Sequence, residues 1–151
     1  MFRGASKVSL DAKGRLAIPS RYRDRIMARG EGHLVATADL DRCLLIYPLP
    51  DWEEIEQELV DLRGLDKPIR ELKRLMVGYA TELDMDGHGR ILVPRELRDF
   101  AALDRQVMLI GQGKKFELWD EERWNVRRDE WLAAQERERG ELPEALASLS
   151  L

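Results

Sequence analysis

A short motif of an aspartate, a glycine and an arginine occurs twice in the chain. Glycine supplies the positive φ of a tight turn, and aspartate can accept hydrogen bonds from the N–H groups of that turn. An arginine directly after such a turn projects a planar guanidinium, which can donate two parallel hydrogen bonds to guanine in a DNA groove. The motif is therefore a candidate for nucleic-acid recognition. Its residues are Asp11, Gly14 and Arg15 in the first copy and Asp86, Gly89 and Arg90 in the second.

The same residues have a second, purely structural interpretation. Each arginine could form an ion pair with the aspartate of its own turn and so pin the turn. We interpret Asp11 and Asp86 in this structural way, because aspartate in a turn commonly has that role. We interpret Arg15 as a DNA contact because many basic residues surround it. For Arg90 both roles stay open.

The motif belongs to a longer internal repeat. Residues 11–24 align without gaps onto residues 86–99, with six of the fourteen positions identical. Farther along, Ile46 matches Leu118, Tyr47 matches Trp119 and Trp52 matches Trp124. The predicted organisation is repeat 1 at residues 5–52, a helical connector at 63–80, repeat 2 at 81–124, and a C-terminal helix and tail at 125–151.

Each repeat is predicted to fold as β-β-α-β-β. In the first copy we expect strands at 7–10 and 15–18, a helix from about 20 to 29, and strands at 34–37 and 43–47. The second copy gives strands at 79–83 and 90–93, a helix at 95–100, and strands at 106–110 and 116–119. Because a tight turn separates the first two strands of each copy, we expect them to pair as a hairpin.

Amphipathic helices are predicted after each repeat. Asp51 resembles a helix N-cap followed by acidic residues, and apolar side chains recur at helical spacing from Trp52 onward. Similar patterns cover residues 66–77 and 120–139. Trp52 and Trp124 are predicted to anchor the core, because both lie in acidic stretches that would repel phosphate groups.

Composition limits the classes of protein that the chain can belong to. Its 151 residues are 44% hydrophobic, which is enough for a buried core. No stretch approaches the length of a membrane-spanning helix, and we place the protein in the cytoplasm. The net charge of −4 conceals a basic segment, residues 1–30, with eight basic and two acidic residues. Such a segment can bind a polyanion or can be an ordinary solvated surface.

The residues also resemble a known family. The two Asp-x-x-Gly-Arg motifs, each followed by a short apolar strand and a proline, are similar to the swapped-hairpin DNA-binding unit of the SpoVT/AbrB type. The opening MFRG at residues 1–4, the presence of two such units and the segment YPLPDW at residues 47–52 together resemble the MraZ family of bacterial transcriptional regulators.

This resemblance implies a fold and a function. The fold would be α+β, a pseudo-symmetric swapped-hairpin β-barrel made by the two repeats, with flanking amphipathic helices. The protein would form a homo-oligomer, in the shape of a ring, and would bind double-stranded DNA at direct repeats in the promoter of the division and cell-wall gene cluster. It would act there as a repressor, associated with the nucleoid. No cofactor and no small-molecule substrate is implied.

The two copies are not equivalent in charge. Lys13 and Arg21 of the first copy are replaced by His88 and Glu96 in the second, so we expect the first copy to dominate DNA binding. The predicted DNA contacts are Arg3, Lys7, Lys13, Arg15, Arg21, Arg23 and Arg90.

Two other classes of function compete with this one. An enzyme ranks lowest, because the chain has no recognisable catalytic constellation or phosphate-binding glycine loop. His33 and His88 have no ligand partners at metal-binding spacing, so we expect no metal site. The alternative is an antitoxin-like module that binds DNA through its barrel and a protein partner through its helices.

Overall fold

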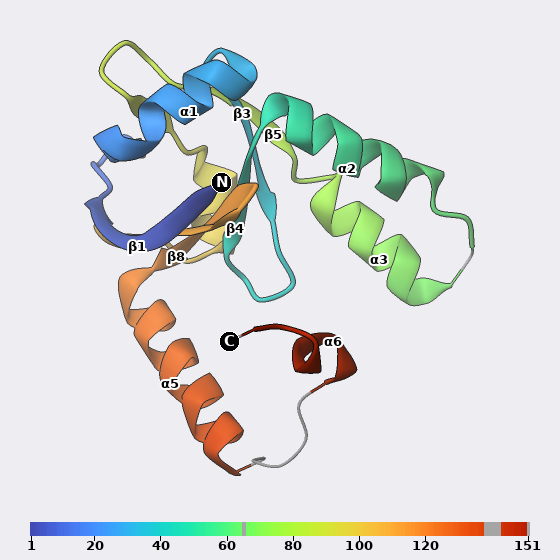
Figure 1. Ribbon diagram of the computed structural model, residues 1–151. Helices are drawn as coiled ribbons and strands as arrows, with labels where there is room; N and C mark the ends of the chain where they lie inside the picture. Colours follow the sequence, from blue (N-terminus) through green and yellow to red (C-terminus); the bar gives the residue numbers. More distant parts are fainter. Residues whose placement is uncertain (65, 138–142, 151) are drawn as a thin grey trace. The chain divides into compact units, whose positions relative to one another are not determined.

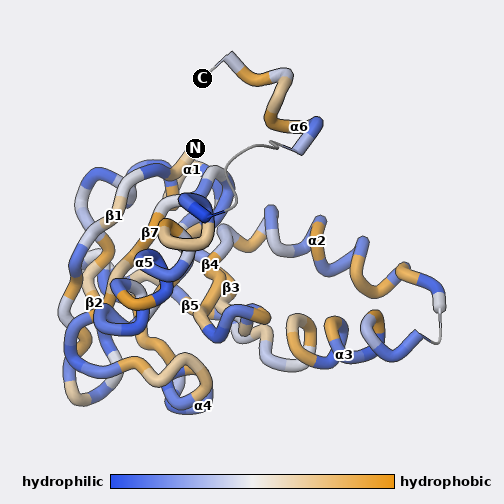
Figure 2. The backbone as a smooth tube through the Cα atoms, turned by 90° about the horizontal axis from the view of Figure 1, so that it is seen from below, coloured by the Kyte–Doolittle hydropathy of each residue, from blue (hydrophilic) through white to orange (hydrophobic). Residues whose placement is uncertain are grey.

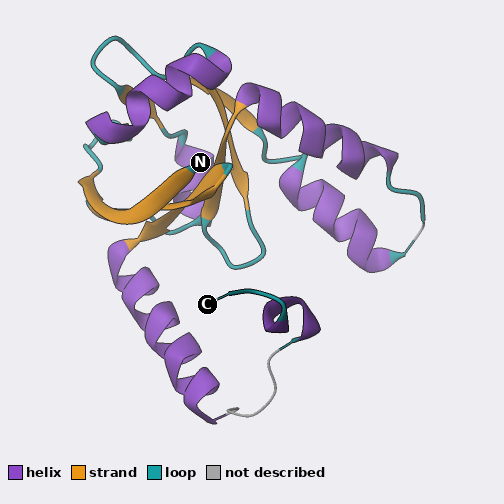
Figure 3. Ribbon diagram, viewed as in Figure 1, coloured by secondary structure: helices purple, strands orange, loops and turns teal. Residues whose placement is uncertain are grey.

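A computed structural model describes residues 1–64, 66–137 and 143–150 of the chain. The chain divides into two compact units, Met1–Glu121 and Glu122–Leu151. Figure 1 traces the elements in chain order, and Figure 3 distinguishes helices from strands. Every strand of the described residues lies in the first unit.

The elements alternate in a regular order. The strands of the described residues are β1 (Phe2–Ser9), β2 (Arg15–Ala17), β3 (His33–Ala38), β4 (Leu44–Pro48), β5 (Thr81–Asp84), β6 (Arg90–Leu92), β7 (Gln106–Gly113) and β8 (Lys115–Asp120). The helices are α1 (Ser20–Gly30), α2 (Leu49–Asp61), α3 (Lys67–Met76), α4 (Arg95–Phe100), α5 (Glu121–Arg137) and α6 (Glu144–Ala147). The order β-β-α-β-β occurs twice, and the predicted α+β class is confirmed.

The strands form two antiparallel sheets. The larger sheet has six strands in the order β1-β7-β8-β4-β3-β5, and the smaller sheet pairs β2 with β6. Among the described residues, strands of the first copy thus pair with strands of the second at four places, β1 with β7, β2 with β6, β3 with β5, and β4 with β8. Among the described residues no ladder joins the edge strands β1 and β5, so the larger sheet is open.

The predicted hairpin between the first two strands of each copy is wrong. Its turn forms, but β1 continues along β7 for all eight of its residues, while β2 pairs with β6. A ladder between β1 and the three-residue β2 would leave most of β1 without hydrogen-bond partners. Pairing β2 with β6 instead places Leu16 and Ile91 opposite each other, and both are buried. Local sequence patterns predict a strand and a turn but do not identify the partner strand.

The core of the first unit lies on one face of the larger sheet. Phe2 of β1 stacks on Phe116 of β8 with ring centroids 4.2 Å apart, and Tyr22 of α1 packs against both rings. Figure 2 shows hydrophobic segments at β3 and β4. Because residues from both copies fill one core, neither copy has a complete core of its own.

Helices α2 and α3 follow the first copy. The helix α2 begins at Leu49 after Pro48, so the prediction of Asp51 as its N-cap is wrong. Asp51 lies within the first turn, is buried, and pairs with Arg29 of α1 at 3.0 Å. Trp52 is buried against Tyr47, with ring centroids 5.7 Å apart, as predicted for a core anchor. In Figure 2, α3 alternates between hydrophobic and hydrophilic residues along its length.

The second unit contains most of α5 and the short helix α6. Trp124 is half-buried and packs edge-on against Trp131 at 5.8 Å, so its prediction as a core anchor is wrong. None of the residues of α5 is buried. The predicted end of this helix at residue 139 lies outside the described residues. No described helix is long and apolar enough to cross a membrane.

Candidate nucleic-acid interface

The Asp11 carboxylate closes the first turn. Its Oδ1 atom accepts hydrogen bonds from the backbone N–H of Lys13 at 2.9 Å and of Arg15 at 2.8 Å. The N–H of Gly14 donates to the Asp11 carbonyl at 3.0 Å. These donors, above all the N–H of Arg15, lower the pKa of Asp11. The carboxylate is therefore charged at neutral pH and holds the turn in one conformation.

The second turn repeats this arrangement. The Oδ1 atom of Asp86 accepts hydrogen bonds from the backbone N–H of His88 at 2.8 Å and of Arg90 at 2.9 Å. The N–H of Gly89 donates to the Asp86 carbonyl at 3.0 Å. The pKa of Asp86 is likewise lowered, mainly by the N–H of Arg90. The two turns thus have the same hydrogen bonds although His88 replaces a lysine.

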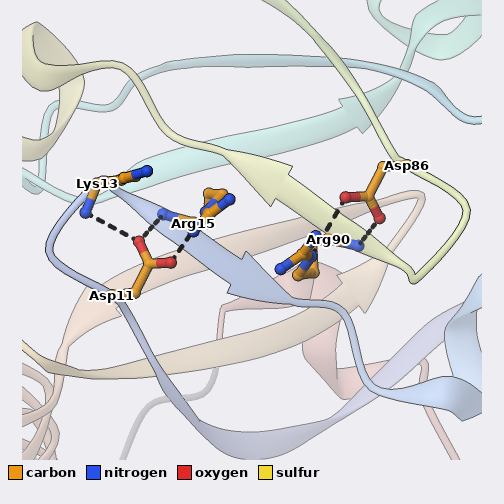
Figure 4. A network of polar contacts seen from close by, with 5 residues as sticks. All are labelled: Asp11, Lys13, Arg15, Asp86 and Arg90. Carbon is orange, nitrogen blue, oxygen red and sulfur yellow. Dashed lines mark hydrogen bonds and ion pairs between the residues drawn. The ribbon is translucent and has the colours of Figure 1, made fainter.

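Each aspartate also positions the arginine of its own turn. The Nε atom of Arg15 donates to Oδ2 of Asp11 at 2.9 Å, and Nε of Arg90 donates to Oδ2 of Asp86 at 3.2 Å (Figure 4). The two arginine side chains are 38% and 41% exposed. Among the described residues, no hydrogen bond engages the terminal Nη atoms of either arginine. The ion pair therefore fixes the direction of each guanidinium while its two terminal donors stay available.

The ribbon of β2 and β6 presents both arginines on one surface. Its register places Arg15 opposite Leu92, Leu16 opposite Ile91, and Ala17 opposite Arg90. Leu16 and Ile91 are each 1% exposed and point into the core. Because successive side chains of a strand point to opposite faces, the other four residues share the outer face. We call this surface the ribbon face: Arg15, Ala17, Arg90 and Leu92.

Contacts between the two copies hold the ribbon in place. The N–H of Val93 donates to the Gly14 carbonyl at 2.8 Å, and Nε of Arg98 donates to the Val93 carbonyl at 3.0 Å. Gly14 has φ +91°, and a Cβ there would lie 2.7 Å from both the Val93 oxygen and Arg98 Nε. Only glycine fits this close approach without displacing backbone.

Equivalent hydrogen bonds hold the other end of the ribbon, at the second turn. The N–H of Ile18 donates to the Gly89 carbonyl at 2.8 Å, and Nε of Arg23 donates to the Ile18 carbonyl at 2.8 Å. Gly89 has φ +76°, and the Arg23 side chain lies directly against it. Each turn is therefore braced by an arginine from the helix of the other copy.

The described residues contain no group of three or more side chains suited to hold a metal ion.

Comparison with known proteins identifies the family. A family model described as "MraZ protein, putative antitoxin-like" matches residues 1–75 and again residues 76–140. Each match contains one of the two turns, together with its half of the ribbon. The chain belongs to the MraZ family. Within this family the two matches correspond to the internal repeat that the amino-acid sequence reveals.

Three MraZ proteins illustrate the similarity. The transcriptional regulator MraZ of Thioalkalivibrio sulfidiphilus is 56% identical over 151 residues, covering 100% of both chains. The transcriptional regulator MraZ of Halorhodospira halophila is 55% identical over 152 residues, again covering 100% of both chains. That of Methylococcus capsulatus is 54% identical over 132 residues, covering 87% of each chain.

The basic residues predicted to contact DNA lie in three places in this MraZ chain. Lys13 is exposed in the first turn, close to the ribbon face (Figure 4). Arg3 is exposed on β1, and Lys7 of the same strand forms an ion pair with Glu121 at 3.2 Å. Arg21 donates to Ser6 Oγ and to the hydroxyl of Tyr22, and Arg23 braces the second turn. Only Lys13, Arg15 and Arg90 lie in the turns or on the ribbon face.

Two features of this MraZ site were missed by sequence reasoning. The bracing role of Arg98 could have been suspected, because Arg23 and Arg98 are identical at equivalent positions of the repeat. Leu92 could have been found from strand alternation. It follows the buried Ile91 and therefore shares the outward face of Arg90, where its side chain is 53% exposed.

Proposed function

We propose that the chain is a DNA-binding transcriptional regulator whose ribbon face enters the major groove of double-stranded DNA. The observation that carries the proposal is the pair of aspartate-fixed arginines, Arg15 and Arg90, on the outer face of a two-stranded ribbon. A major groove about 12 Å wide admits such a ribbon. The naming of the similar proteins as transcriptional regulators supports the same function, and no enzymatic activity is needed.

The arginines supply base recognition in this proposal. Asp11 holds Nε of Arg15, and the two Nη atoms then donate to O6 and N7 of one guanine. Because the carboxylate has already restricted the side chain, less conformational entropy is lost when the guanine binds. Arg90 makes the equivalent contact from the second turn, with a weaker surrounding positive charge because His88 and Glu96 replace basic residues.

Phosphate contacts provide affinity that does not depend on base sequence. Lys13 and Arg3 are exposed, and the exposed Lys7 can exchange Glu121 for a phosphate. Arg21 and Arg23 use some of their donors within the protein and contribute those that remain. Each phosphate neutralised releases counterions, so binding weakens steeply as the salt concentration rises.

The larger assembly is also part of the proposal. The repeats at 5–52 and 81–124 form two interleaved units of a swapped-hairpin barrel, which the four strand pairings between the copies support. Several chains assemble into a ring, so that one oligomer binds several direct repeats of a promoter with high avidity. The target is the division and cell-wall gene cluster, which the protein represses in the cytoplasm at the nucleoid.

Substitution of the ribbon arginines tests the function. In Arg15→Ala, one bidentate guanine contact worth about 1–3 kcal/mol is lost in each chain bound to DNA, which lowers affinity about 5- to 150-fold per contact. Because several chains bind together, specific binding should disappear. Arg90→Ala should have a smaller effect, and the matched control Arg70→Ala, on the exposed surface of α3, should have none. The measurement is fluorescence anisotropy with the protein's own upstream promoter and with unrelated duplex.

The control for folding is the thermal unfolding midpoint, which Arg15→Ala should leave unchanged. Wild-type affinity in Arg15→Ala would refute the assignment of the ribbon face.

The second candidate function is the antitoxin-like module, which the family description "putative antitoxin-like" supports. Copurification of a small protein partner in stoichiometric amount would favour that candidate.

A further inference from the structure

The two sides of the ribbon face differ in one apolar side chain. Leu92 lies opposite Arg15, and the repeat places Ala17 at the equivalent position, opposite Arg90. The neighbours of Leu92 in the strand, Ile91 and Val93, are 1% and 0% exposed, whereas Leu92 itself is 53% exposed. The side chain of Leu92 therefore points away from the core, and packing of the core does not require an apolar residue at this position.

The position of Leu92 relative to Arg15 suggests what it contacts. Side chains directly opposite in an antiparallel pair have Cβ atoms about 4.5–5.5 Å apart. Neighbouring base pairs are about 3.4 Å apart along the helix axis. A guanidinium and a leucine that leave the ribbon side by side therefore reach the same or adjacent base pairs.

Thymine is the base that offers an apolar partner in the major groove. Its C5-methyl group projects into the groove, while the other base edges present mainly donors and acceptors. A leucine side chain is shorter than that of arginine, but the projecting methyl group reduces the distance that it must cover. The methyl group of Ala17, attached directly to its backbone, is too short to make the same contact.

We propose that Leu92 is a specificity-determining residue, which packs against the C5-methyl group of a thymine beside the guanine bound by Arg15. This inference rests on the proposed function. Because Ala17 makes no equivalent contact, the pseudo-symmetric ribbon recognises a different base step on each side. The chain then binds a direct repeat in one orientation only, which a symmetric ribbon could not ensure.

Removal of the thymine methyl group tests the contact without a known operator. Binding sites are selected by the full-length protein from randomised duplexes made with thymidine or with deoxyuridine, which lacks the methyl group. Wild-type protein should enrich a thymine beside the guanine of the motif in the first pool only. In single duplexes, replacing that thymine by deoxyuridine should weaken binding about fourfold per repeat, equivalent to about 0.8 kcal/mol for one buried methyl group.

Two variants assign the effect to the side chain. Leu92→Ala should bind thymidine and deoxyuridine duplexes equally, with an unchanged unfolding midpoint because Leu92 is exposed. Ala17→Leu should add a second methyl dependence, beside the guanine bound by Arg90. Equal binding of both duplexes by the wild-type protein, or a methyl dependence that persists in Leu92→Ala, would overturn the proposal.

The proposed function fails in a different way. If Arg15→Ala selects the same motif as the wild-type protein, the ribbon face is not the DNA-binding surface, and the role of Leu92 is overturned with it. If Arg15→Ala loses the motif while the wild-type protein ignores the methyl group, only the inference about Leu92 fails.

Discussion

Replacement of Gly14 by alanine tests whether contact between the two copies maintains the ribbon. The new Cβ would lie 2.7 Å from the Val93 carbonyl oxygen and 2.7 Å from Arg98 Nε. The carbonyl belongs to the backbone and cannot rotate away as a side chain can. The ribbon must therefore shift, which breaks the hydrogen bond from the Val93 N–H to the Gly14 carbonyl and the one from Arg98 to the Val93 carbonyl.

The expected loss of stability follows from these contacts. A non-glycine residue at φ +91° costs about 1–2 kcal/mol. The backbone hydrogen bond contributes about 0.5–1.5 kcal/mol, and the bond donated by the charged Arg98 about 1.5–3 kcal/mol. Gly14→Ala should therefore destabilise the fold by about 3–6 kcal/mol. At roughly 2–4 °C per kcal/mol for a chain of this size, the unfolding midpoint should fall by roughly 6–24 °C.

Thermal unfolding followed by circular dichroism measures this change. Gly87→Ala is the matched control, because it lies in the second turn, has no positive φ, and a Cβ there would meet no atom within 4 Å. Its midpoint should stay at the wild-type value or rise slightly, since alanine restricts the unfolded chain. A midpoint of Gly14→Ala within about 1 °C of the wild type, or an equal loss in Gly87→Ala, would refute the reasoning.

Two further predictions concern pH and thiol chemistry. The hydrogen bond to Asp84 raises the pKa of His33 above 6.5, so protonated His33 stabilises the fold at low pH, and this stabilisation is lost as pH rises through the raised value. The urea midpoint should therefore fall less in His33→Gln than in the wild type between about pH 6 and pH 8; equal falls would contradict the assignment. Burial raises the pKa of the Cys43 thiol, so a disulfide reagent at neutral pH should modify the native protein slowly and the urea-unfolded protein fast. Rapid modification of the native protein would show that this thiol is accessible.

Features set by a few neighbouring residues could be predicted from the sequence. The turn at residues 11–14 forms because its aspartate and its glycine are both within the turn. The burial of Trp52 follows from its place in an apolar pattern at helical spacing. The start of α2 at Leu49 was less predictable. Aspartate is a common N-cap residue, but Asp51 is instead buried and pairs with Arg29.

Features set by distant residues could not be predicted in this way. Nothing local to β2 indicates that its partner is β6 rather than β1, because the same alternation of side chains suits either ladder. Arg21 and Arg23 belong to a basic segment, but only the fold reveals that Ser6 and the Ile18 carbonyl accept some of their hydrogen bonds. The internal repeat predicts two units of similar fold. It does not indicate which strands of one copy pair with which strands of the other.

The strand order of the larger sheet has a consequence for synthesis of the protein. The ribosome releases β1 first, but the partner of β1 is β7, about one hundred residues later in the chain. The strand β8, which joins β7 to β4 in the middle of the sheet, emerges last. Contacts so distant in sequence fold slowly and leave apolar strands exposed in the meantime. During translation, the strands of the first copy therefore wait for their partners in the second, and the six-stranded sheet can be complete only after residue 120 has left the ribosome.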